Sequence, residues 1–283
     1  MTEGSLAKQI LLVSLPLMLS NLLQVLFNMS DVAVVGRFAG STALGSVGST
    51  SIFVTLFTGF LIGLSNGINV LVARFYGARQ EKEVHKTVHS ALIVSLIAGV
   101  ILLLIGLLGS PALLELLNTK EDLLPGAILY LRIYFLGMPF FMLYNYGAAI
   151  LRAVGDTKRP LIFLIISGVT NAILNMILVI VFRLGVAGVA IGTVMSQLMS
   201  CVLVLRCLYK TDSSYQLRFE KLAIKSVYLK QIFQVGIPAG IQSTVINFSN
   251  VLLQSSVNSF GSTAMAGYTA ANNLLGFLYM SVN

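Results

Sequence analysis

One acidic side chain, Asp31, lies inside a long apolar stretch, where a charge is costly. The chain has ten acidic residues, and the other nine lie outside its apolar runs. An Asp at the centre of a membrane helix costs about 2.5–3.5 kcal/mol on insertion scales, so such residues usually face the bundle interior and mark an ion or proton path. Gln24, Asn28 and Asp31 are spaced four and three residues apart and therefore share one helix face. We predict that Asp31 binds a cation or proton on such a path; the alternative is an interfacial Asp31, solvated or paired with Arg37.

Amides and hydroxyls recur in the other apolar runs, as a wet cavity between helices requires. Asn171 and Asn175 are four residues apart in one run, while Tyr130 and Thr193 lie in two others. Any one of these side chains could instead form a single interhelical hydrogen bond, worth about 0.6 kcal/mol. Together they predict a cavity that is lined by Gln24, Asn28, Tyr130, Asn171, Asn175 and Thr193.

The composition shows what kind of scaffold must position these residues. Hydrophobic residues make up 57% of the 283 residues, charged residues only 10%, and the mean hydropathy is +0.90. Soluble domains carry about 25% charged residues, so soluble enzymes, secreted modules and disordered chains are excluded. A membrane-spanning helix needs about 20 mostly apolar residues. The runs that meet this requirement are Ile10–Val35, Ser49–Ala73, Ser90–Leu108, Leu124–Leu151, Pro160–Phe182, Val186–Leu208, Ile232–Ser259 and Ala264–Asn283.

The basic residues indicate the orientation of these spans. The N-terminus and the alternate loops on its side hold 14 of the 18 Lys and Arg residues. The positive-inside rule therefore predicts a cytoplasmic N-terminus. We expect a multi-pass protein of the plasma (inner) membrane. The same distribution explains the net charge of +8 without nucleic-acid binding, because the basic residues lie in short gaps between apolar runs.

The start of the chain recurs 222 residues later. Lys8-Gln9-Ile10 matches Lys230-Gln231-Ile232, Pro16 matches Pro238, and a Gly-Ser-Thr-Ala sequence follows in both copies. Six spans separate the copies, so the repeats are parallel, an arrangement typical of secondary transporters. We predict an all-α polytopic membrane protein with a six-helix N-lobe (residues 1–215), followed by a linker and an incomplete C-lobe with helices 7 and 8 (residues 216–283). The full protein would then have twelve helices.

Catalysis and structural metal binding are not predicted. His85 and His89 are four residues apart, but no third ligand lies near them, and Lys86 lies between them. Cys201 and Cys207 lie about 9 Å apart along one helix, too far for a disulfide. We therefore expect neither an enzyme nor a cofactor.

Three stretches resemble the multidrug and toxic compound extrusion (MATE) family. They are Pro16–Asn21 through Asp31 and Gly36, the loop Leu151–Pro160, and Gly185–Ala190 through Gln197; Gly236-Ile237-Pro238 in the second copy is also similar. The resemblance covers the whole chain, with the C-lobe truncated.

The resemblance implies a monomeric antiporter that exports small organic, often cationic or amphipathic, compounds in exchange for H⁺ or Na⁺. It implies that Asp31 is the protonatable acid, with Gln24, Tyr130, Asn171 and Thr193 lining the N-lobe cavity. Two positions depart from the family: Asn175 replaces an Asp of some members, and Ile246 replaces a Glu of the seventh helix. The alternatives are a lipid-linked sugar flippase of the same broad superfamily and a non-transporting membrane scaffold.

Overall fold

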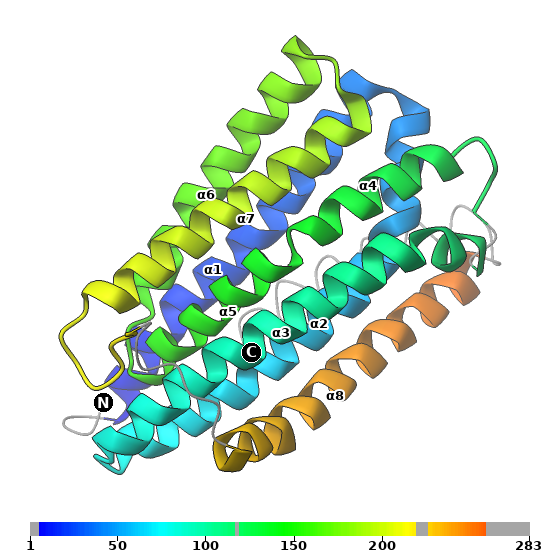
Figure 1. Cartoon of the computed structure of the whole chain (residues 1–283). Helices are drawn as coiled ribbons and strands as arrows, with labels where there is room; N and C mark the ends of the chain where they lie inside the picture. The colour runs from blue at the N-terminus through cyan, green and yellow to red at the C-terminus, as the bar shows by residue number, and fades with distance from the viewer. Residues whose placement is uncertain (1–5, 117–118, 219–225, 259–283) are drawn as a thin grey trace.

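The described part of the chain folds into a bundle of long helices (Figure 1). The computed structural model describes residues 6–116, 119–218 and 226–258. Its elements are α1 (Leu6–Val34), η1 (Val35–Ala39), α2 (Ser41–Gly77), α3 (Glu81–Leu116), α4 (Leu124–Leu136), α5 (Met138–Ala153), α6 (Lys158–Met176), η2 (Ile177–Val181), α7 (Gly185–Lys210) and α8 (Ser226–Asn258). The all-helical prediction is confirmed for these residues. The predicted run Ala264–Asn283 lies outside them.

Several helices are long and apolar enough to cross a membrane. Among the described residues, four helical segments each meet this condition without a partner: α2, α3, Lys158–Val181 and α7. In α1 the segment Val13–Gln24 is apolar. α2 has 37 residues and α3 has 36, so both are longer than the predicted apolar runs and extend beyond a hydrocarbon layer of about 30 Å.

The predicted run Leu124–Leu151 is not one straight helix. α4 and α5 meet at Gly137 with a bend of 44°, and the pair together could form one span. Pro139 causes the break, because it cannot donate the backbone hydrogen bond that would continue the helix. Gly99 of α3 lets the bent segment approach closely, since a Cβ at this position would lie 2.7 Å from Pro139 Cα.

Aromatic and aliphatic side chains fill the space between α2, α3 and α4. The ring of Phe135 on α4 packs edge-on against Phe57 of α2, with ring centroids 5.4 Å apart. Gly106 of α3 lies directly under the Phe135 ring, where a Cβ would overlap it. This packing fixes the register of α4, which carries two tyrosines toward the bundle interior.

The last described helix, α8, packs along α2 through glycine (Figure 1). Gly59, Gly63 and Gly67 repeat every four residues on α2 and face α8. A Cβ at Gly67 would lie 2.6 Å from the backbone of Gly236, so the two helix backbones are in direct contact. The predicted division of the chain at residue 215 stays a prediction.

Candidate functional site

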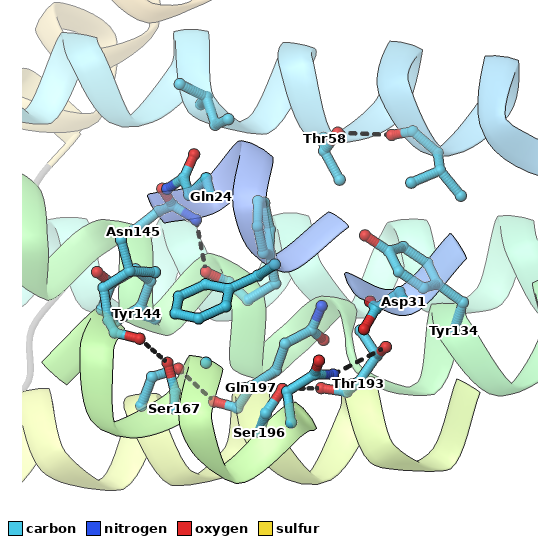
Figure 2. A pocket seen from close by; sticks show the side chains of 18 of the residues that line it. Gln24, Asp31, Thr58, Tyr134, Tyr144, Asn145, Ser167, Thr193, Ser196 and Gln197 are labelled. Atoms are coloured by element: carbon cyan, nitrogen blue, oxygen red, sulfur yellow. Dashed lines mark hydrogen bonds between the residues drawn. The ribbon is translucent and has the colours of Figure 1, made fainter. Parts of the chain in front are cut away.

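A cavity of about 380 Å³ lies between α1, α2, α4, α5, α6 and α7 (Figure 2). Its lining is mostly hydroxyl, amide and aromatic: Gln24, Phe27, Asp31, Val54, Thr55, Thr58, Ile62, Tyr130, Tyr134, Phe141, Tyr144, Asn145, Leu164, Ser167, Gly168, Asn171, Thr193, Ser196, Gln197 and Ser200. Figure 2 shows Asp31 and Tyr134 toward one end of the cavity, and Tyr144, Asn145 and Ser167 toward the other. The cavity therefore has one acidic end.

A chain of hydrogen bonds holds Asp31 from α6 and α7. Asn175 Nδ2 donates to Asp31 Oδ1 at 2.6 Å and to Asn171 Oδ1 at 3.2 Å. Asn171 Nδ2 donates in turn to Thr193 Oγ1 at 3.4 Å, and the Thr193 hydroxyl donates to the Val189 carbonyl at 3.0 Å. The spacing of four residues between Asn171 and Asn175 places both amides on one face of α6. They can therefore hydrogen-bond to each other.

The orientation of the Asn175 amide follows from its neighbours. Its NH₂ group has two acceptors, so the amide oxygen must point the other way, where it is buried without a donor among the described residues. That oxygen lies against Gly192 of α7, and a Cβ at this position would overlap it. Gly192 therefore provides the space that allows Asn175 to face Asp31.

Gly192→Ala is expected to weaken transport about tenfold by displacing Asn175 from Asp31, because a hydrogen bond to a charged group contributes about 1.5–3 kcal/mol. Efflux of a fluorescent organic cation from cells that express the full-length gene measures the effect. Gly48→Ala is the matched control, since a Cβ there meets nothing within 4 Å. Equal efflux by the two variants would show that the Asn175 orientation does not matter.

Most of the predicted site residues lie together. Five of them line the cavity, namely Gln24, Asp31, Tyr130, Asn171 and Thr193. Asn175 is fully buried behind the lining and bonds Asp31 and Asn171 directly. The side chain of Asn28 lies outside the described part of the chain.

The alternative partner of Asp31 does not contact it. Arg37 lies exposed in η1, and the bond that the structure gives to the Asp31 carboxylate comes from Asn175. Both η1 and η2 are π-helical, and they follow Asp31 and Asn175 by a few residues. Short π-helical segments often occur at functional sites, and these two lie next to the Asp31–Asn175 pair in the sequence.

Several lining residues were not predicted, although helical spacing would have found them. Tyr134 follows Tyr130 by four residues, and their rings stack with centroids 5.9 Å apart. Ser167 precedes Asn171 by four residues on α6 and also lines the cavity. Thr55 and Thr58 on α2 are three apart. The amides and the acid could be predicted because they are rare in apolar runs, whereas hydroxyls and tyrosines are common there.

The charge and shape of the lining suit an organic cation. Asp31 carries the only formal charge among the described lining residues, while Arg132 of α4 is exposed and lies elsewhere. Aromatic rings of Phe27, Tyr134 and Phe141 border the same space. Aromatic faces attract cations, and a nearby carboxylate adds to that attraction.

The histidine pair lies near the beginning of α3 and makes structural contacts there. The rings of His85 and His89 stack 4.1 Å apart, and both ring nitrogens of His89 contact backbone atoms. The residues that the structure describes contain no group of three side chains that could hold a metal ion.

Comparison with known proteins identifies the family. The MatE family model matches residues 16–177, more than half of the chain. The chain is 32% identical over 278 residues to "Probable multidrug resistance protein YpnP" of Bacillus subtilis (strain 168), covering 96% of this chain and 61% of that protein. It is 28% identical over 269 residues to "Multidrug export protein MepA" of Staphylococcus aureus (strain bovine RF122 / ET3-1), covering 93% and 58%.

A solved structure has the same arrangement of helices. It is described as the "Outward-facing conformation of a multidrug resistance MATE family transporter of the MOP superfamily". The TM-score is 0.90 at 25% identity, over 99% of this chain and 62% of that one. The fold and the cavity define a multi-pass helical membrane protein of the transporter type. The chain belongs to the multidrug and toxic compound extrusion (MATE) family, and it spans about 61% of the length of YpnP.

Proposed function

We propose that the protein is a secondary antiporter that exports organic cations across the plasma membrane in exchange for H⁺ or Na⁺. The observation that carries the proposal is the hydrogen-bonded series Asp31–Asn175–Asn171–Thr193 at one end of an aromatic-lined cavity. The names of the multidrug relatives support the substrate class. In this proposal the protein is a monomer and no resident cofactor is needed.

Exchange follows from competition for one carboxylate. A protonated Asp31 is neutral and gives no Coulombic attraction to a cationic substrate, whereas an ionised Asp31 attracts it. Substrate and coupling ion therefore exclude each other at the same end of the cavity. Each can cross only in its own half of the cycle, which makes the exchange obligatory.

The competing functions predict a different lining. A flippase for lipid-linked sugars needs cationic side chains for the pyrophosphate group, and the described lining has none. A scaffold needs no buried acid, yet Asp31 lies in α1 and binds Asn175. Both features favour the antiporter.

Reconstituted full-length protein in liposomes tests the proposal. Adding an organic cation on the substrate side should release protons, or drive Na⁺ movement, in proportion to substrate uptake. Movement of a lipid-linked sugar without ion exchange would indicate the flippase instead. Absence of both transport activities would leave the scaffold.

The proposed orientation places the N-terminus in the cytoplasm. Cysteine at Lys82 or Lys158 should then be protected from impermeant thiol reagents in intact cells, whereas cysteine at Lys120 should be labelled, because the two groups flank opposite ends of the helices. Native Cys201 and Cys207 are first replaced by serine to remove background labelling. The reverse labelling pattern would overturn the orientation.

We further propose that the described conformation opens outward, which is supported by the match to the outward-facing structure.

A further inference from the structure

The beginning of α3 contacts both the segment after α7, at Arg218, and α8, at Tyr228. His89 contacts the backbone of Arg218, with the Arg218 N–H donating to Nε2 at 3.1 Å. Leu217, one residue earlier, is fully buried. The segment that follows α7 is thus held against α3 as far as Arg218.

α8 meets the same end of α3 through a small charged cluster. The Tyr228 hydroxyl donates to Glu83 Oε2, and Lys86 Nζ lies 2.8 Å from Glu83 Oε1. The Tyr228 ring packs edge-on against Phe75 of α2, with centroids 6.2 Å apart, and the residue is only 7% exposed. The hydrogen bond to Glu83 raises the pKa of the Lys86 ammonium, as expected when the carboxylate is ionised.

Farther along the α2–α8 contact, glycines let the two helices approach closely. Gly63 faces Gly240, and Gly67 faces Gly236, so backbone lies against backbone. The first copy of the repeat has Ser14 and Met18 where α8 has Gly236 and Gly240, counting back 222 residues. The side chains of Phe60 and Leu64 pack beside Gly240 and Gly236, so the closest backbone approach of the two helices lies at these positions. Among the described residues, the hydrogen bond from Tyr228 to Glu83 joins α8 to α3 at one end of this contact.

We propose that Glu83, Lys86, Tyr228 and Phe75 form a reversible cytoplasmic latch, which holds α8 against α2 and α3 while the cavity faces outward and opens when it faces inward. The inference rests on the proposed antiporter function and orientation. Glu83 is the central acceptor, Tyr228 is the moving donor, and the glycine contact is the pivot. A latch of one charge-assisted hydrogen bond and one aromatic contact suits a two-state element, because it is strong enough to bias a population and weak enough to open.

Crosslinking tests whether the contact must open. Glu83→Cys with Tyr228→Cys is made in the full-length protein lacking Cys201 and Cys207. The pair should form a disulfide, which should lower efflux at least about tenfold, and reduction should restore efflux. Tyr76→Cys with Tyr215→Cys is the matched control, because these rings are 6.4 Å apart at the same end but join α2 to the segment that follows α7. Crosslinking the control pair should leave efflux unchanged.

A second measurement does not depend on transport. Ser200 lines the cavity on α7, ten residues before the end of that helix. Tyr228→Phe keeps the ring and removes the hydroxyl, so it should increase cytoplasmic-side labelling of Ser200→Cys about tenfold in inside-out vesicles, as expected for the loss of one hydrogen bond to a carboxylate. Tyr215→Phe should not change this labelling.

The outcomes separate the latch from the function on which it rests. Full efflux with the Glu83–Tyr228 pair crosslinked, or unchanged labelling in Tyr228→Phe, would overturn the latch and leave the antiporter standing. A pair that does not crosslink would contradict the contact itself. Absence of efflux before crosslinking would count against the antiporter, while the labelling experiment would still decide about the latch.

Discussion

Asp31→Asn is expected to reduce substrate efflux to below about one hundredth of the native rate while the protein still folds and inserts. In the proposed mechanism, the variant removes the charged form of the group that coupling ion and substrate share. A loss of this size corresponds to about 2.7 kcal/mol, within the range for losing a buried charge-assisted interaction. Asn has nearly the same shape, and its amide oxygen can still accept the bond from Asn175. Removal of a charge from a membrane helix should if anything favour insertion.

Efflux of a fluorescent organic cation and the amount of protein in the membrane are measured together. Glu121→Gln is the matched control, because it also neutralises a carboxyl group but at an exposed position outside the cavity. Loss of the protein from the membrane would indicate a structural role for Asp31. Full efflux with an unchanged dependence on the ion gradient would move coupling away from Asp31.

Asn175→Leu is expected to lower efflux at least about tenfold, because it leaves the Asp31 carboxylate without its described donor. The same change removes the bond to Asn171 and so disconnects α1 from the series that continues to Thr193. Membrane levels should fall less than efflux, since Leu branches at Cγ as Asn does and has the same number of side-chain heavy atoms.

Exchanging the two residues tests whether the pair acts as a unit. Asp31→Asn combined with Asn175→Asp restores one acid and one amide in contact, now with the acid on α6. We expect this double variant to recover more than about a tenth of native efflux, well above either Asp31→Asn or Asn175→Leu alone. An exchange variant as inactive as Asp31→Asn would show that the acid must be on α1, and that the hydrogen-bonded pair does not function as one site.

The bilayer explains why so much of the fold could be predicted. Backbone groups must be hydrogen-bonded within the membrane, so long apolar runs such as Ser90–Leu108 form helices whatever their neighbours are. The exact ends could not be predicted, because α3 continues into polar flanks to cover Glu81–Leu116. The angle of the bend at Gly137 could not be predicted, since Pro139 breaks the helix but the packing against Gly99 determines how the two halves lie.

Residue type and helical spacing were enough to predict the candidate site residues that are rare in a membrane helix. Asp31, Asn171 and Asn175 are conspicuous there because each buried polar group needs a partner, and helical spacing showed which of them share a face. The common residues of the lining, such as Tyr134 and Ser167, gave no comparable signal.

Only the tertiary structure decided which polar groups meet. The sequence left open whether Asp31 is paired with Arg37, and the structure instead places Asn175 against it, 144 positions away along the chain. That choice depends on Gly192, which leaves room for the Asn175 oxygen, and on the packing of α6 between α1 and α7. Helical periodicity specifies the faces of single helices, whereas the pairing of faces depends on how side chains of different helices fit together. The partner of Asp31 is therefore a property of the packed bundle.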